Sequence, residues 1–165
     1  MKFQVMSRQK ARKHSFREDI KKCVIVSIND KADVRNNFHN NSNIKAICSL
    51  FFDDVEGDEP NCMTRDDADK IIGFVNQYIN DTNDIEEIIV HCGAGVSRSA
   101  GVCAALMLIL TGDDSDIFNN PKFCPNMHCY RLVLESYFGY YDKEAADEKL
   151  RRNIVLWRKV HGLDD

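Results

Sequence analysis

The chain has 165 residues, of which 44% are hydrophobic and 29% are charged, and its formal net charge is −4. A chain of this length and composition is typical of one compact globular domain with a core of its own. The slightly acidic balance argues against nucleic-acid binding through a broad basic surface. We therefore expect a single domain over residues 1–165 and no nucleic-acid partner.

The sequence shows no targeting segment. Its longest apolar run, residues 102–110, is much shorter than the ~20 residues that a membrane helix needs. No apolar stretch directly follows the charged N-terminus, as it would in a secretory signal. The seven cysteines are odd in number and irregularly spaced, which does not fit a disulfide framework. We expect a cytoplasmic protein with no membrane span, whose cysteines are reduced thiols that lie mostly in the core.

The first third of the chain alternates apolar runs with polar segments. Residues 3–6 predict a short first strand, and the β-branched run 23–28 predicts a buried one. The basic stretch 8–13 between them predicts a solvated loop. The polar, Asn-rich segment 29–43 predicts a loop or a short helix. Residues 44–52 predict a second buried strand.

An acidic segment over residues 53–60 predicts a loop after that strand. Thr64, with Asp67 three residues later, then forms a plausible capping box. Apolar residues recur at helical spacing after it. These signals predict a helix over residues 65–80.

The next elements surround a short segment rich in small residues. Residues 85–90 predict an apolar strand, and residues 99–110, apolar nearly all round, predict a buried helix that Gly112 ends. A loop with two prolines follows over residues 113–125. Residues 126–137 predict another helix.

The last predicted element is a charged amphipathic helix over residues 145–160. The side chains expected to face inward are Leu150, Ile154, Trp157 and Val160. Strands that alternate with helices are typical of an α/β domain. We expect a central, mostly parallel sheet of four to five strands flanked by helices.

The segment between the strand 85–90 and the buried helix carries the chemistry. Its residues are His91, Cys92, Gly93, Ala94, Gly95, Val96, Ser97, Arg98 and Ser99. Glycines allow a backbone to curl tightly, and consecutive amides in such a curl form an anion cradle at the positive end of a helix. Residues 93–98 are therefore predicted to bind a phosphoryl group.

Four side chains of this segment have predicted roles. Cys92 is the candidate nucleophile, because helix N-termini and nearby cations favour the thiolate. Arg98 offers a planar fork that holds two phosphate oxygens at once. Ser99 is placed to donate a hydrogen bond to the sulfur, and His91 to orient the loop from behind.

The pattern His-Cys-x5-Arg-Ser resembles the signature of the cysteine-dependent protein tyrosine phosphatase superfamily, and its small loop residues resemble the dual-specificity branch most. The pair Pro125-Asn126 resembles one in that branch, and residues 52–55 resemble a segment of compact bacterial tyrosine phosphatase-like proteins. The similarity extends over residues 20–140. It implies a dual-specificity-phosphatase-like fold and phosphomonoester hydrolysis through a phosphocysteine intermediate, without a cofactor. The implied partner is a phosphorylated protein or a small phosphomonoester.

The resemblance also implies a general acid, an Asp on a mobile loop before the cysteine. Asp53 and Asp54 both qualify, and the bacterial pattern favours Asp54. The competing interpretation is that this acidic run is a solvated loop. Asn126 fits two roles equally, a support that fixes the loop and a plain helix N-cap.

Other functions stay open at this level. Ala94 and Val96 occupy positions where phosphoinositide and inositol phosphate phosphatases often carry Lys or Arg, which disfavours that subclass without excluding it. A pseudophosphatase that binds phosphate without turnover is a further alternative, although such proteins usually lose the Cys or the Arg. Sulfurtransferases and arsenate reductases also use thiols, but the Arg-Ser closure fits a phosphatase better.

Two further patterns are weaker. The segment 124–129, with two cysteines and a histidine, lacks a second pair of ligands at suitable spacing, so we expect no metal site. The basic stretch 8–13 can instead be an electropositive rim that attracts phosphorylated substrate. The sequence predicts no particular oligomeric state.

Overall fold

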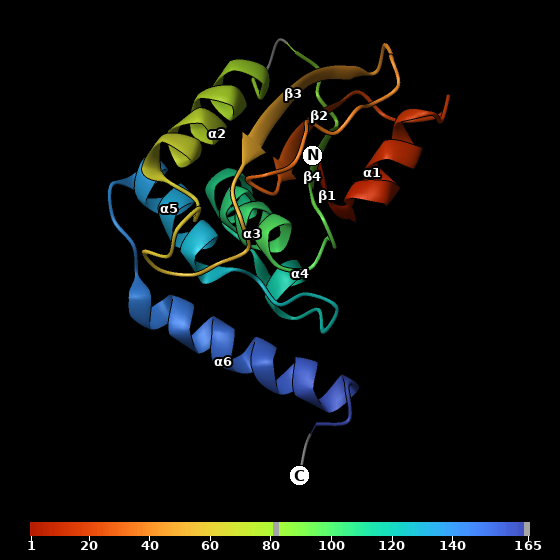
Figure 1. Cartoon of the computed structure of the whole chain (residues 1–165). Helices are drawn as coiled ribbons and strands as arrows, with labels where there is room; N and C mark the ends of the chain where they lie inside the picture. The colour runs from red at the N-terminus through yellow and green to blue at the C-terminus, as the bar shows by residue number, and fades with distance from the viewer. Residues whose placement is uncertain (81–82, 164–165) are drawn as a thin grey trace.

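The structure is a computed structural model that describes residues 1–80 and 83–163. Within these residues the centre is a sheet of four parallel strands in the order β1-β4-β2-β3. The strands are β1 (Lys2–Ser7), β2 (Cys23–Asn29), β3 (Ile44–Phe51) and β4 (Glu87–Cys92). A four-stranded α/β sheet confirms the predicted fold class (Figure 1).

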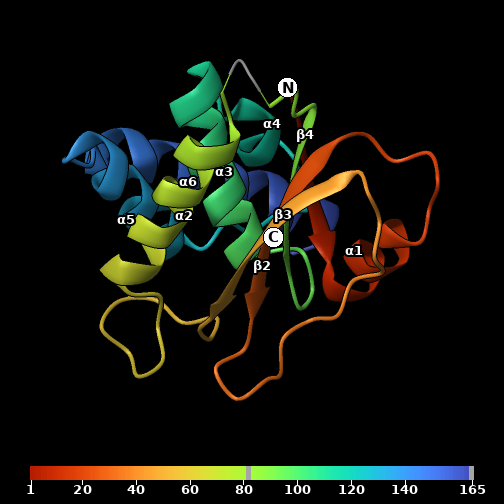
Figure 2. The same cartoon turned by 90° about the horizontal axis from the view of Figure 1, so that it is seen from above.

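Helices cover both faces of the sheet. They are α1 (Arg8–Ser15), α2 (Arg65–Tyr78), α3 (Arg98–Thr111), α4 (Ser115–Phe118), α5 (Met127–Phe138) and α6 (Lys143–Val160). Helix α1 lies on one side of the sheet, and α2, α3 and α5 lie on the other (Figure 2). Helix α6 lies outside α4 and α5, farthest from the sheet (Figure 1). No helix in the described ranges is long and apolar enough to cross a membrane.

The two faces of β4 pack into two separate cores. Ile88 and Val90 belong to the large core that includes residues of α2, α3 and α5. Ile89, between them, belongs to a smaller core with Met6 and Ala11 on the α1 side. Successive side chains of a strand point to opposite faces, and a parallel sheet buries both of them. This explains why the central strands are continuous apolar runs.

Several sequence predictions about element ends are confirmed. Thr64 caps α2 in a capping box with Asp67, and Gly112 ends α3 in the left-handed conformation. Strand β3 is predicted to be buried, but it is an edge strand with mixed burial, and Ile47 is exposed. Among the described strands it pairs only with β2, so its other side stays open.

Residues 8–15 form helix α1, and the prediction of a loop there is wrong. The sequence signal is weak because Ala11 and Ser15 are the only buried residues of this helix. Its stability comes from its ends. The Ser7 side chain accepts a hydrogen bond from the Lys10 amide, and basic residues in the last turn complement the helix dipole.

Two predictions near the C-terminus also need correction. The segment 113–125 is not all loop, because it contains the short helix α4. In α6, Ile154 and Val160 are exposed (40% and 64%), although they were expected to face inward. The buried residues of α6 are Ala146 and Asn153. The Asn153 amide donates to the carbonyls of Phe118 and Phe123, so the helix packs partly through a polar contact that apolar periodicity does not reveal.

Candidate active site at the carboxyl edge of the sheet

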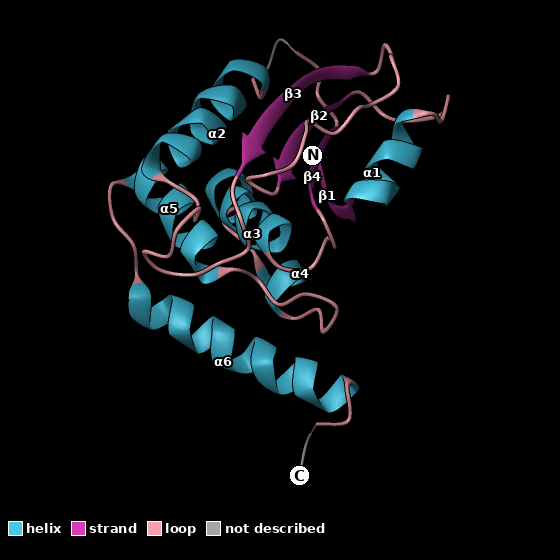
Figure 3. Ribbon diagram, viewed as in Figure 1, coloured by secondary structure: helices cyan, strands magenta, loops and turns pink. Residues whose placement is uncertain are grey.

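The candidate site lies where the parallel strands end. Figure 3 shows the arrows of β2 and β3 pointing the same way, so the loops that follow them emerge at one edge of the sheet. The loop from β4 to α3 emerges there too, because β4 is parallel to β2. Ligand sites of open α/β sheets typically lie outside the carboxyl ends of the strands. The segments that begin at residues 30, 53 and 92 therefore lie together at this edge of the sheet.

The loop between Cys92 and Arg98 is shaped by one glycine above all. Gly95 has φ of +73°, and a Cβ there would lie 2.5 Å from backbone atoms of Met6 and Ser7. Only glycine fits such a conformation beside a neighbouring backbone at no steric cost. Gly93 lies beside the Arg98 guanidinium, since a Cβ there would be in ordinary van der Waals contact with Nη2 at 3.7 Å.

The Cys92 thiol lies at the base of this loop and is only 2% exposed. Its Sγ is 3.0 Å from Ser99 Oγ and accepts a hydrogen bond from the Gly95 amide at 3.3 Å. The structure thus brings Ser99 to the cysteine, as the sequence predicts.

Arg98 begins helix α3 and is 5% exposed. Its Nη1 donates to the carbonyl of Phe52 at 2.7 Å and pairs with Asp30 Oδ1 at 2.6 Å. Its Nε is buried without a hydrogen-bond partner in the structure. A buried donor with no partner is costly, and a ligand with an acceptor oxygen at this edge of the guanidinium would satisfy it.

His91 is fully buried behind the loop. Its Nε2 lies 2.7 Å from Ser27 Oγ, and its Nδ1 lies 3.3 Å from the Cys92 carbonyl. Burial lowers the pKa of His91 to about 4, which keeps the ring neutral near pH 7. The ring contacts the Cys92 carbonyl and Ser27 of β2, which suits the predicted role of orienting the loop.

The two candidate acids point to different neighbours. Asp54 Oδ1 accepts hydrogen bonds from Ser97 Oγ at 2.8 Å and from Asn126 Nδ2 at 2.9 Å. Asp53 Oδ1 instead accepts from the backbone amide of Lys31 at 2.8 Å. Asp54 therefore touches the loop that holds Cys92, whereas Asp53 contacts the segment after β2.

Asn126 combines the two roles that the sequence left open. Its Oδ1 accepts from the Cys129 amide and caps α5. Its Nδ2 donates to Asp54, and its backbone amide donates to the Ser97 carbonyl at 3.1 Å. The residue thus links a helix N-terminus, the acidic loop and the loop at Cys92.

The cysteines outside the loop include core residues and two neighbours of the site, because the Cys124 amide donates to the Val96 carbonyl at 3.1 Å and the Cys129 amide donates to Asn126 Oδ1 at 3.0 Å. Cys23 and Cys103 are buried, and burial raises the pKa of their thiols to about 11 and about 12. His128, in the segment considered for metal binding, directs Nε2 at the Met63 carbonyl at 2.8 Å. Within the described residues no group of three or more His, Cys, Asp or Glu side chains is placed to hold a metal ion.

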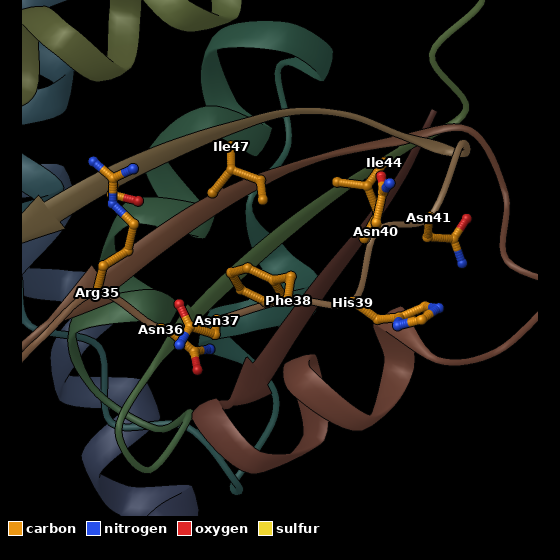
Figure 4. Close-up of a pocket in the computed structure, with 10 residues that line it drawn as sticks. Arg35, Asn36, Asn37, Phe38, His39, Asn40, Asn41, Ile44 and Ile47 are labelled. Carbon is orange, nitrogen blue, oxygen red and sulfur yellow. The ribbon is translucent and has the colours of Figure 1, made fainter.

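A cavity of about 360 Å³ lies on the α1 side of the sheet (Figure 4). The segment 35–41 lines one side of it, and Ile44, Ile47 and Ser49 line the other. Cys92 and Arg98 do not line this cavity. It is linked to the loop through Asn36, whose Nδ2 lies 3.5 Å from His91 Nε2.

Comparison with known proteins identifies the family. The family model described as "Dual specificity phosphatase, catalytic domain" matches residues 7–136. The chain therefore belongs to the dual-specificity phosphatase family, as its signature predicts, and the phosphatase class implies phosphorylated substrates. The comparison with curated proteins gives no match.

Three solved structures are similar to this chain. The human tyrosine phosphatase-like serine/threonine/tyrosine-interacting protein is 16% identical, with TM-score 0.41, over 81% of this chain and 77% of that one. Human DUSP28 is 13% identical, with TM-score 0.45, over 98% and 95% of the two chains. Tk-PTP, described in its active form, is 12% identical, with TM-score 0.39, over 92% and 88%. The family assignment rests on the family model.

Sequence reasoning missed two contacts of Arg98, the carboxylate of Asp30 and the carbonyl of Phe52. One signal was available for Asp30, since it directly follows a buried strand at the edge where sites of α/β sheets form. No signal was available for Phe52, because a backbone carbonyl has no sequence signature.

Proposed function

We propose that this protein hydrolyses phosphomonoesters through a covalent phosphocysteine on Cys92. The observation that carries the proposal is the arrangement around the sulfur. A buried thiol contacts a hydroxyl and a backbone amide, and the signature arginine beside it keeps a buried nitrogen without a partner. This combines an activated nucleophile with a positioned anion-binding group.

In the first step the Cys92 thiolate attacks phosphorus, and the bond from phosphorus to the ester oxygen breaks. Arg98 and the amides of residues 93–98 hold the non-bridging oxygens, and Asp54 gives its proton to the leaving oxygen. In the second step water attacks phosphorus while Asp54 takes a proton from it. The S–P bond breaks, inorganic phosphate leaves, and the Ser99 hydroxyl stabilises the regenerated thiolate.

Asp54 is the better candidate for the acid because of what it touches. Its contacts with Ser97 and Asn126 both involve Oδ1, and Ser97 belongs to the loop that would hold the phosphoryl group. The side chain is exposed, so a substrate can reach it. Asp53 is engaged by the Lys31 amide instead.

A phosphorylated protein, at tyrosine or with dual specificity, is the substrate class that fits best. Ala94 and Val96 supply no cations for additional phosphates, which disfavours polyphosphorylated inositols. The nucleophile has to be a free thiol, and a reducing compartment such as the cytoplasm keeps it so.

We also assign helix α6 to the phosphatase domain. The domain then spans residues 1–165, although the family model ends at residue 136. Asp114 is 4% exposed and accepts from Lys149 Nζ at 2.8 Å and from Tyr130 OH at 2.6 Å. Together with Asn153, this network joins α6 to α4 and α5.

The proposal is tested by turnover of an aryl phosphate, with phosphopeptides and inositol phosphates assayed beside it. Cys92→Ser should lose at least about 10³-fold in kcat, because the nucleophile is removed. Cys48→Ser is the matched control, since that half-buried thiol lies in the middle of β3 and away from the carboxyl edge, and it should keep full activity. Full activity in Cys92→Ser would contradict the mechanism. A wild type that binds phosphate without turning over aryl phosphate would support a pseudophosphatase.

A further inference from the structure

A tight turn follows strand β2 and lies against the candidate site. The Asp33 amide donates to the Asp30 carbonyl at 2.9 Å, which closes the turn over residues 30–33. The Lys31 amide donates to the Asp53 side chain at 2.8 Å, so the acidic loop after β3 braces the turn from one side. The turn is therefore fixed by its own backbone and by a neighbouring loop.

Two arginines from other elements meet the carboxylates of this turn. Asp30 pairs with Arg98, whereas Asp33 pairs with Arg8 at the start of α1. Arg8 also donates its backbone amide to the Gly93 carbonyl at 3.1 Å. Each end of the turn thus contacts a different cation beside the loop.

The contacts of Arg98 divide its guanidinium into two parts. Nη1 donates a hydrogen bond to the Phe52 carbonyl at 2.7 Å and forms an ion pair with Asp30 Oδ1 at 2.6 Å. Nε is buried with no partner, and Nη2 faces Gly93, where a Cβ would lie 3.7 Å away. Nε and Nη2 donate from the same edge of the planar group, which is the geometry that binds two phosphate oxygens.

From this division we propose that Asp30 is a positioning residue for phosphate binding. It occupies Nη1 and thereby aims the Nε and Nη2 edge of Arg98 into the loop. This inference rests on the proposed function only in that the bound group is a phosphate. Asp30 itself touches Arg98 and not the substrate.

Long-range electrostatics and the positioning role predict opposite changes in phosphate affinity when Asp30 is removed, so the proposal can be tested sharply. A carboxylate near an anion site repels the anion, so its removal should strengthen phosphate binding. Positioning predicts that removal of Asp30 weakens it. Asp33 is the matched control, because it carries the same charge in the same turn but pairs with Arg8.

The experiment measures the affinity for inorganic phosphate by NMR titration in the Cys92→Ser background, where no turnover occurs. Asp30→Ala should weaken binding about tenfold, because the ion pair that orients the guanidinium is lost. Asp30→Asn keeps a side chain of the same shape beside Nη1 but removes its charge, and it should weaken binding about two- to threefold. Asp33→Ala should leave the affinity unchanged or raise it up to about twofold. Thermal melts verify that each variant folds, which the half-exposed position of Asp30 (52%) favours.

A double-mutant cycle then assigns the effect to Arg98. In an Arg98→Lys background, Asp30→Ala should change phosphate affinity less than about twofold, because no guanidinium is left for Asp30 to aim. Unchanged or tighter binding in Asp30→Ala alone would overturn the proposal. A tenfold loss that persists in the Arg98→Lys background would overturn it too, because the effect would then not pass through the guanidinium.

Failure of this inference is distinguishable from failure of the proposed function. Wild-type turnover combined with an unchanged phosphate affinity in Asp30→Ala would contradict only the positioning role. Absent turnover combined with the expected loss of affinity would contradict only the hydrolase activity.

Discussion

The loop from Cys92 to Arg98 and the turn from Asp30 to Asp33 lie at the same edge of the sheet, but they contribute to the site in different ways. The loop carries its chemistry in consecutive residues, and local backbone conformation shapes it, above all at Gly95. The turn reaches the site through its contact with Arg98. The difference shows that a parallel sheet brings supporting residues to a signature loop from strands that are distant in sequence.

The largest effect is expected from a change in the backbone of the loop. Gly95→Ala should destabilise the protein by about 3 kcal/mol, because it combines left-handed strain with overlap against the backbone of Met6 and Ser7. Gly57→Ala is the control, since Gly57 has a similar φ of +69° with open space around it, and should cost about 1 kcal/mol. Urea unfolding measures both. Equal losses would show that the loop is not held tightly by β1.

Substitutions of the two neighbouring acidic residues test which of them is the general acid. Asp54→Asn should lower kcat for an aryl phosphate about 100-fold, the range of general acid catalysis. Asp53→Asn keeps an oxygen that can accept from the Lys31 amide, so it should stay within about threefold of wild type. The reverse order of losses would move the general acid to Asp53.

His91 directly precedes the loop and contacts Ser27 of β2, and its effect on stability should depend on pH. Burial lowers its pKa to about 4 in the folded protein, whereas the unfolded chain has the ordinary value of about 6.5. Between these values the unfolded state binds more protons, so stability falls as the pH falls. Between pH 7 and pH 5 the loss from this residue should be about 2 kcal/mol.

Urea unfolding at the two pH values measures this loss. His91→Gln should remove about 2 kcal/mol of the pH dependence, because Gln does not titrate. His39→Gln, at an exposed histidine, is the control for the substitution itself. An unchanged pH dependence in His91→Gln would show that the ring is not buried as described.

Much of the fold was predictable because the central elements have strong local signals. The apolar runs of β2 and β4, the capping box at Thr64 and the terminating Gly112 are all readable from neighbouring residues. Helix α1 was missed because it buries only two small side chains, and the inward face of α6 was misjudged because Asn153 packs through hydrogen bonds.

In the candidate site, too, contacts within one motif were predictable, whereas contacts that depend on the tertiary fold were not. The contact of Cys92 with Ser99 was predictable, since both residues belong to one motif. The pairing of Arg98 with Asp30 was not, because it depends on β2 and β4 being neighbours in the sheet. The resemblance already favoured Asp54 over Asp53, and the structure adds that Asp54 contacts Ser97 whereas Asp53 contacts the Lys31 amide.

The most direct test of the account is the detection of the phosphoenzyme. Asp54→Asn lacks the base that activates water, so the phosphocysteine should accumulate with an aryl phosphate whose leaving group needs no proton. Rapid denaturing quench and peptide mass spectrometry should then find one phosphoryl group on Cys92, and none in Asp54→Asn combined with Cys92→Ser. Turnover of the aryl phosphate by wild type, with no phosphoryl group on Cys92 in either protein, would contradict the mechanism.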